Sequence, residues 1–262
     1  MKGESSMIDI HSHILPNVDD GAQTEQESIA LAKAAAKEGI TKIVATPHHK
    51  NRTYDNYKSE IKYQVSVLND LLSAHQLSLT VLPGQEVRIF GEILEDYENG
   101  EILTVNETKY ILVEFPSDSV PQYAQKLFYD MQLQGLVPVI VHPERNRELL
   151  QHPETMYELI LNGALSQVTA ASLIGKFGKQ IAQYSEELID ANLTHFIASD
   201  AHNTTTRPFH LKEAYEHVRK EFGVETYFQL LENSELLVDN MNVNRMEPII
   251  PKKRRKKLFG LF

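Results

Sequence analysis

Histidine and acidic residues recur in this chain directly after short apolar runs. His11 and His13 follow the apolar run at residues 7–10, and Asp200 and His202 follow another such run far along the chain. Imidazole nitrogens and carboxylate oxygens are ligands that proteins use for divalent ions such as zinc, manganese and iron. Alternate residues of an extended segment point the same way, so the rings of His11 and His13 can hold one ion between them. The pattern predicts a metal site.

The same position, at the end of an apolar run, selects a larger set of candidate ligands. The segment 46–49 offers two adjacent imidazoles, of which we expect His48, nearer to the run, to face the site. Glu86 and Glu114 lie in apolar surroundings, where a carboxylate needs a nearby cation. The candidates are His11, His13, His48, Glu86, Glu114, His142, Asp200 and His202, together with Asp20, whose spacing by itself favours a plain turn.

Simpler interpretations exist for single members of this set. A surface pair would account for His11 and His13 alone, and a salt bridge at a strand end would account for Glu114. Neither explains why the ends of six separate runs carry residues of ligand type. The other histidines lie on expected helices or at the start of a run, and we interpret them as structural: His75, His152, His195, His210 and His217.

The number and type of candidate ligands indicate the chemistry. Eight or nine ligands exceed what one ion can use, so we expect two or three ions that share carboxylate bridges. Mixed nitrogen and oxygen ligation suits manganese, iron, zinc or magnesium. Clustered divalent ions lower the pKa of a bridging water, so that hydroxide forms near neutral pH, and they bind the oxygens of a displaced group. This chemistry fits hydrolysis of a phosphate ester best.

Two arginines follow candidate ligands closely and complete the expected site. Arg145 and Arg207 each present a planar guanidinium that can bind phosphate oxygens in a fixed fork, a geometry that a lysine cannot copy. The alternative interpretation for each is an ordinary surface arginine.

Ligands so far apart in the sequence require a scaffold in which strand ends meet. The apolar runs predict short strands, and helical spacing between them predicts helices over 24–37, 55–76, 121–134, 153–161, 178–191 and 208–222. The first of these helices opens on a Thr-x-x-Glu capping pattern and closes before Gly39. Parallel strands need crossover helices, and the carboxyl ends of barrel strands share one rim. The sequence therefore predicts an α/β fold with a parallel sheet closed, or partly closed, into a barrel.

Composition excludes several other classes of protein. With 262 residues, 42% of them hydrophobic and 24% charged, the chain can bury one sizeable core. The absence of cysteine removes disulfides and thiolate ligands, which fits the reducing cytoplasm. The net charge of −10 repels polyanions, so we expect no nucleic-acid partner.

The two ends of the chain differ from the rest. Residues 1–6 are polar and are interpreted as a leader or a remnant of cloning, and the barrel is expected to span 7–247. The tail at 248–262 joins six consecutive basic residues, 252–257, to an apolar end. Such a tail suits an acidic partner or the surface of an anionic membrane, so we expect a cytoplasmic protein that contacts the inner face of the membrane peripherally.

Six motifs in combination resemble a known family. They are Ile8-Asp9-Ile10-His11-Ser12-His13-Ile14-Leu15-Pro16, Asp19-Asp20-Gly21, Ala45-Thr46-Pro47-His48-His49, Pro83-Gly84-Gln85-Glu86, Val139-Ile140-Val141-His142-Pro143-Glu144-Arg145-Asn146 and Ala198-Ser199-Asp200-Ala201-His202. Together they resemble the polymerase and histidinol phosphatase (PHP) superfamily. Within it, the chain from Met7 to about Asn240 is similar to the CpsB/YwqE-like group of bacterial manganese-dependent protein-tyrosine phosphatases, encoded beside capsule and exopolysaccharide genes.

The resemblance implies a distorted (β/α)7 TIM-like barrel with a trinuclear manganese site. It makes Asp20 a ligand and implies phosphate binding by Arg145 and Arg207, with Asp200 and His202 as further residues of the catalytic site. It also implies a substrate, phosphotyrosine on a membrane-associated bacterial tyrosine kinase that regulates polysaccharide synthesis. The implied ligand sets are His11, His13, Glu86 and Asp200 for the first ion, Glu86, Glu114 and His142 for the second, and Asp20, His48 and His202 for the third.

Three alternatives remain open at this point. A small-molecule phosphatase of the same superfamily, acting for example on histidinol phosphate, would use the same metals. A non-catalytic metal-binding regulator would keep the ligands without the reaction. An amidohydrolase also begins with His-x-His on a barrel strand, but that fold usually bridges its metals with a modified lysine at a strand end, and no strand expected here ends in lysine.

Overall fold

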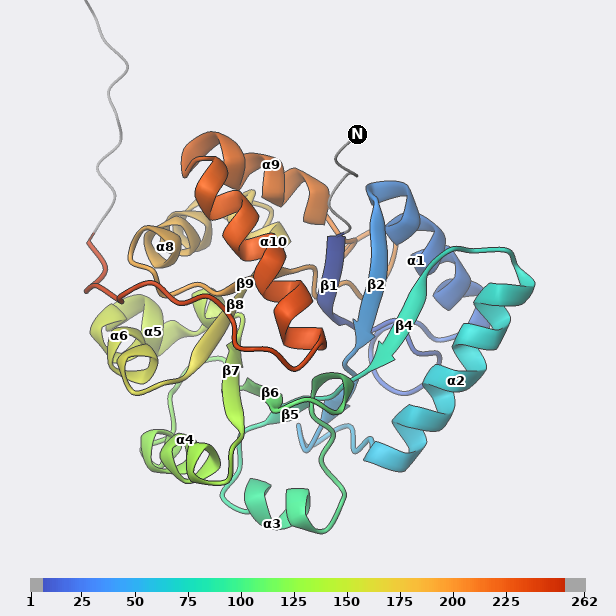
Figure 1. The fold of residues 1–262 in the computed structure, drawn as a ribbon, viewed down its shortest axis with the longest axis horizontal. Helices are drawn as coiled ribbons and strands as arrows, with labels where there is room; N and C mark the ends of the chain where they lie inside the picture. The colour runs from blue at the N-terminus through green and yellow to red at the C-terminus, as the bar shows by residue number, and fades with distance from the viewer. Residues whose placement is uncertain (1–6, 253–262) are drawn as a thin grey trace, which may run out of the picture.

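Strands and helices alternate along the chain in the computed structural model, which describes residues 7–252 (Figure 1). The strands are β1 (Met7–Ser12), β2 (Ile40–Ala45), β3 (His48–His49), β4 (Thr80–Pro83), β5 (Glu86–Arg88), β6 (Tyr110–Glu114), β7 (Val137–Val141), β8 (Leu165–Thr169) and β9 (Phe196–Ala198). The helices are α1 (Glu25–Glu38), α2 (Lys58–Ala74), α3 (Ile93–Glu98), α4 (Ala124–Leu133), α5 (Arg147–Gln151), α6 (Pro153–Leu161), α7 (Ala170–Leu173), α8 (Lys179–Asp190), α9 (Leu211–Glu221) and α10 (Val224–Val238), with 3-10 turns η1 (Val105–Glu107) and η2 (Pro143–Arg145).

All strand pairs are parallel, as the alternation predicts. The ladders run β1-β2-β4 and β3-β5-β6-β7-β8-β9. Only two residues separate β2 from β3, and two separate β4 from β5, so each pair is one interrupted strand that passes from the first ladder to the second. A parallel bridge between Ser12 and Ala201 then brings the end of β9 back beside β1. Counted in this way, seven strands form a distorted (β/α)7 barrel.

Two apolar clusters fill the space inside and outside this barrel. The inner cluster contains residues such as Ile10, Leu112 and Val139, and α10 closes it through Leu237 and Val238. Figure 1 shows α10 lying across the strands at the centre of the view. The larger, outer cluster lies between the strands and the helices that surround them. Alternate residues of one strand serve the two clusters, as Leu112 and Val113 of β6 do.

The first helix illustrates how local sequence sets an element. The Thr24 side chain accepts a hydrogen bond from the Glu27 N–H at 3.2 Å and caps the helix. Gly39 ends it with φ of 90°, in the left-handed region that glycine adopts without steric cost. The Glu27 carboxylate accepts from the N–H of Gln23, one residue before the position that a capping box uses.

The predicted helices all appear, with ends shifted by at most three residues, and the six apolar runs form strands. Further elements of the fold, β8, β3, β5, α10 and the short helices, are not predicted from the sequence. The run in β8, Leu165-Ser166-Gln167-Val168-Thr169, is partly polar, although the structure buries all of it. Among the described residues, no helix is both long and apolar enough to cross a membrane.

The predictions for the two ends of the chain concern residues that the structure describes only in part. Residues 1–6 and 253–262, which include most of the basic run, lie outside the described residues. The domain boundary at 247 therefore stays a prediction.

Candidate metal centre and phosphate-binding site

All nine predicted ligands lie at the carboxyl ends of strands or in the loops that follow them. Their atoms form three groups in which every ligand atom lies within 4.8 Å of the others. The groups are His11, His13 and Asp200; His48, Glu86 and Glu114; and His13, Asp20, His48 and His202. His142 adjoins them, because its Nε2 lies 2.7 Å from Glu86 Oε1. The barrel thus brings the whole predicted set together at one rim.

The innermost group has the dimensions of a metal site. Nε2 of His11 lies 3.5 Å from Glu86 Oε2 and 3.6 Å from Asp200 Oδ1. Nε2 of His13 lies 3.4 Å and 3.3 Å from the same two oxygens. Neither Nε2 atom has a hydrogen-bond partner, although both are buried. Two ligands at about 2.1 Å from one ion lie about 3.0–3.4 Å apart in tetrahedral or octahedral geometry, so these four atoms fit a shared divalent ion.

Glu86 and His48 connect the groups. The Glu86 carboxylate is fully buried, and its Oε2 lies near Nε2 of His11 and His13 and 2.7 Å from Nδ1 of His48, whereas its Oε1 contacts His142. The opposite nitrogen of His48 lies 3.3 Å from Asp20 Oδ1, which is also 3.4 Å from His202 Nε2. A carboxylate between two groups can bridge two ions. The structure therefore places Asp20, which the sequence left open as a turn residue, directly among the imidazoles.

Outer partners fix the orientation of the two central imidazoles. Nδ1 of His11 lies 2.9 Å from Gln167 Oε1, and Nδ1 of His13 lies 2.7 Å from Asp19 Oδ2. Each contact leaves Nε2 as the atom that faces the group, which is a common arrangement of metal-binding histidines. The sequence interpretation missed Gln167, because it had no strand there, and it treated Asp19 only as part of a turn. A carboxylate just after a His-x-His pair was the available signal for Asp19.

Close packing and unusual backbone angles also shape the site. A Cβ atom on Gly21 would lie 2.1 Å from the backbone oxygen of His13, so only glycine allows the Asp19 turn to approach the His13 ring. The Gly21 N–H in turn donates to Asp19 Oδ1. His142 and Asp200 have φ of 37° and 53°, in a region that non-glycine residues rarely adopt. Such strain is often found where side chains must converge at a functional site.

Burial and neighbouring charges set the protonation of the cluster. Burial, followed by the charge of Arg145, lowers the pKa of His142 to about 4. Burial and the charge of His13 lower the pKa of His202 to about 4. Both rings are therefore neutral near pH 7, the form that binds metal. Burial and the charge of Glu86 raise the pKa of Glu114, which shows that cations would be favourable between these two carboxylates.

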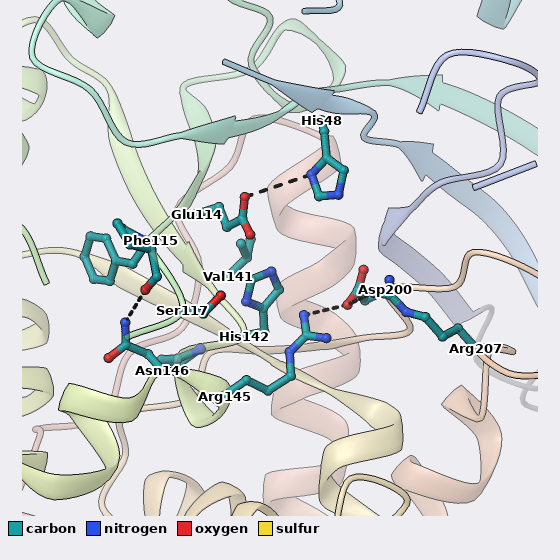
Figure 2. Close-up of a pocket in the computed structure, with 12 residues that line it drawn as sticks. His48, Glu114, Phe115, Ser117, Val141, His142, Arg145, Asn146, Asp200 and Arg207 are labelled. Carbon is teal, nitrogen blue, oxygen red and sulfur yellow. Dashed lines mark hydrogen bonds and ion pairs between the residues drawn. The ribbon is translucent and has the colours of Figure 1, made fainter. Parts of the chain in front are cut away.

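Arg145 and Arg207 converge on one oxygen of Asp200. Their Nη2 atoms lie 2.6 Å and 2.8 Å from Asp200 Oδ2, while Oδ1 of the same carboxylate faces His11 and His13. Figure 2 shows both guanidinium groups pointing toward Asp200, with His142 next to Arg145 and with His48 and Glu114 farther from the two arginines. The cavity has a volume of about 250 Å³ and is also lined by Phe115, Ser117 and Asn146.

The remaining acidic and histidine residues lie outside the ligand groups of the described chain. His49 packs its ring edge-on against Tyr57, so only His48 of this pair joins the cluster. Within the described residues Asp9 belongs to none of the ligand groups, and its carboxylate accepts hydrogen bonds from Ser199. None of the histidines interpreted as structural belongs to a ligand group within residues 7–252. His195, for example, is buried at the start of β9, and His217 pairs with Glu186.

This protein is a metal-dependent hydrolase that acts on a phosphate ester. Its imidazoles and carboxylates meet at one rim of a parallel barrel, and two arginines lie beside them. Comparison with known proteins places the chain more narrowly. Residues 7–239 match the family model described as capsular polysaccharide synthesis, CpsB/CapC. The chain belongs to this family.

Individual relatives agree with this assignment. The chain is 52% identical to tyrosine-protein phosphatase YwqE of Bacillus subtilis over 98% of its own length and the full length of that protein. It is 44% identical to CapC of Staphylococcus aureus over 97% of this chain and all of that one. A solved structure from work on YwqE of Bacillus subtilis and CpsB of Streptococcus pneumoniae, described as unique metal-dependent tyrosine phosphatases, matches with a TM-score of 0.92 and 51% identity, covering 95% of this chain and 100% of that chain.

Proposed function

We propose that this protein is a metal-dependent protein-tyrosine phosphatase. The observation that carries the proposal is the convergence of Arg145 and Arg207 on Asp200, at the edge of a cavity whose other side carries metal-ligand residues. Two guanidinium groups side by side match the oxygens of a phosphate monoester. The relative YwqE is named a tyrosine-protein phosphatase, and the matching solved structure is described as metal-dependent.

The residues of the chain divide the chemistry between them. Arg145 and Arg207 bind the phosphate oxygens, and Asp200 orients both guanidinium groups through one oxygen. Bound divalent ions supply Lewis acidity that activates water and neutralises phosphate charge. The nine ligand residues would hold these ions, and Gln167 and Asp19 would keep the His11 and His13 rings in place. A tyrosine phenol has a pKa of about 10, so it is a good leaving group compared with the serine hydroxyl.

We assign the ions as manganese, two or three for each chain, with iron, zinc or magnesium as the other candidates. The grouping of ligand atoms supports His11, His13, Glu86 and Asp200 around one ion and Asp20, His48 and His202 around another. Glu114 and His142 would complete a further ion through the shared carboxylate of Glu86. Imidazole nitrogens among the ligands favour manganese, iron or zinc over the harder magnesium ion.

The proposed substrate is phosphotyrosine on a membrane-associated bacterial tyrosine kinase and its targets, in the control of capsular polysaccharide synthesis. The description of the family, capsular polysaccharide synthesis, supports this setting. We further propose that the protein is cytoplasmic and that the basic tail 248–262, most of which lies outside the described residues, brings an otherwise acidic enzyme to the inner face of the membrane.

One set of rates tests the proposed activity. Initial rates with manganese should be compared for a phosphotyrosine peptide, a phosphoserine peptide of the same sequence and histidinol phosphate. Hydrolysis of the phosphotyrosine peptide should be the fastest of the three. Faster hydrolysis of histidinol phosphate would favour a small-molecule phosphatase, and no hydrolysis of any substrate would favour a metal-binding regulator.

Single ligand variants test the metal residues separately. His142→Ala and Glu86→Ala should each lower turnover by orders of magnitude and reduce the manganese bound per chain. The matched control is His152→Ala, which removes an exposed histidine that pairs with Glu154. Thermal unfolding of each variant separates loss of metal from loss of the fold.

A further inference from the structure

Phe177 is an exposed aromatic residue at the tip of a tight turn on the catalytic side of the barrel. The turn follows β8 and lies between α7 and α8. The N–H of Gly178 donates to the Gly175 oxygen at 3.1 Å, and both glycines have positive φ, 83° at Gly175 and 97° at Gly178. This geometry fixes the turn and leaves the Phe177 side chain 37% exposed. A single exposed ring is not unusual by itself, so the neighbours of Phe177 decide what it can do.

The Phe177 ring contacts the arginine to which we assign phosphate binding. Its centroid lies 5.6 Å from Cζ of Arg145, the geometry of a cation–π contact. Asp200 holds the same guanidinium from another direction at 2.6 Å. Helix α8, which begins directly after the turn, also packs against η2, the turn that carries Arg145. The ring and the phosphate-binding group therefore have a fixed relationship.

We propose that Phe177 determines specificity by packing against the aromatic ring of the substrate. The inference rests on the proposed phosphatase activity and adds the contact that selects an aryl ester. In a phosphotyrosine a single oxygen joins phosphorus to the ring, so a phosphate held by Arg145 keeps its ring within a few ångströms. His48, Glu114 and His142 line the cavity together with Arg145, and Phe177 contacts the Arg145 guanidinium. A substrate ring that extends from the bound phosphate away from the metal-ligand residues and past Arg145 would therefore meet Phe177.

A competing role for Phe177 is to orient Arg145 alone. In that case the loss of the ring would weaken all phosphate ligands to the same degree. If instead the ring contacts the substrate, only ligands with an aromatic group should be weakened. Non-hydrolysable phosphonates separate the two roles, because their binding does not depend on the leaving group.

The test uses the manganese-loaded full chain and the variants Phe177→Leu and Phe177→Tyr. The control is Phe228→Leu, the same change at an exposed phenylalanine of α10. Phenylphosphonate and methylphosphonate are titrated as competitive inhibitors and by calorimetry. For Phe177→Leu we expect the phenylphosphonate inhibition constant to rise about three- to tenfold, the range for one aromatic pair, with methylphosphonate unchanged within about twofold. Phe177→Tyr and Phe228→Leu should stay within about twofold of wild type for both ligands.

The same variants are then assayed on the phosphotyrosine peptide, where Phe177→Leu should mainly raise KM. An equal rise for both phosphonates would assign Phe177 to positioning of Arg145 and overturn the inference. Unchanged constants in Phe177→Leu would overturn it as well, while leaving the phosphatase activity intact. Failure of the wild-type protein to hydrolyse the phosphotyrosine peptide would instead overturn the proposed function and the inference together. Thermal unfolding confirms that each variant is folded.

Discussion

Asp9 and Ser199 are hydrogen bonded although 190 residues separate them in the sequence. Oδ1 of Asp9 accepts from the Ser199 N–H at 2.9 Å, and Oδ2 accepts from the Ser199 hydroxyl. One residue further on, the Asp200 N–H donates to the oxygen of His11 at 2.9 Å. The first strand and the segment after the last strand are thus joined at the point where each carries a predicted ligand.

Ser199→Ala should therefore loosen this junction. Removal of the hydroxyl takes one donor from a fully buried carboxylate, and we expect a loss of about 1–3 kcal/mol in the free energy of unfolding. Manganese affinity should fall too, because Asp200 follows directly. Urea unfolding and metal titration measure the two effects. Ser185→Ala, which removes a hydroxyl bonded within α8, is the control and should leave manganese affinity unchanged.

Arg145→Lys should be severely impaired although it conserves charge. A lysine cannot copy the planar fork that the guanidinium presents to a phosphate, and it cannot stack a planar group on the Phe177 ring. We expect kcat on one phosphotyrosine peptide to fall at least tenfold, which corresponds to about 1.4 kcal/mol of transition-state stabilisation. Turnover within about twofold of wild type would contradict phosphate binding by Arg145 and leave it only the ion pair with Asp200.

Chelation should abolish hydrolysis, and manganese should restore it better than magnesium. The predicted site contains five imidazoles, His11, His13, His48, His142 and His202, and magnesium prefers oxygen ligands. The measurement is activity after dialysis against a chelator, followed by titration with each ion. Full activity in excess chelator would contradict the metal assignment.

His195 should make the fold sensitive to mild acid. Burial, followed by the charge of Arg245, lowers the pKa of this ring to about 3. In the unfolded chain its pKa is about 6.5, so below that pH the unfolded state binds a proton that the folded state excludes. The contribution of His195 to the free energy of unfolding is therefore fully present above about pH 6.5. It is lost progressively as the pH decreases toward 3. Between pH 7 and pH 5 the loss from this ring is about 2 kcal/mol.

The comparison variant is His195→Asn, whose amide oxygen can still accept a hydrogen bond from the Ser166 N–H, as the ring does at 3.2 Å. Urea unfolding of metal-free protein at pH 7 and pH 5 should show a smaller loss for the variant than for wild type. His152→Asn, an exposed histidine, should behave as wild type does. Equal losses in all three proteins would assign the acid sensitivity to other groups.

Deletion of the residues after Ile250 should weaken binding of the protein to an anionic membrane without changing its rate of hydrolysis. The deleted segment contains all six residues of the basic run, each expected to contribute about 1 kcal/mol near an anionic surface. We expect unchanged hydrolysis of a small peptide and weaker binding to phosphatidylserine vesicles at low ionic strength. If truncated and full-length proteins bind these vesicles equally, the tail has no part in membrane contact.

The sequence by itself determined the alternation of strands and helices and the types of residue at the site. The helix expected over 153–161 is α6 with the same bounds, and the Thr24 cap and the Gly39 stop set α1. These features depend on apolar periodicity and on side chains that bond to their own backbone, so neighbouring residues suffice to predict them. The histidine and acidic residues at the ends of the apolar runs could be predicted for the same reason, because each is identified by its neighbours in the sequence.

Only the tertiary structure decided which of these atoms meet. The polar strand β8 had no apolar run to reveal it, yet it supplies Gln167 to the His11 ring. The positions of His48 between two ligand groups and of Phe177 against Arg145 depend on strand order, register and the packing of a distant turn. A local pattern specifies where a side chain lies on its own element. Its distance to a residue on another element is set by how the whole barrel closes, because many weak contacts along the chain fix that geometry together.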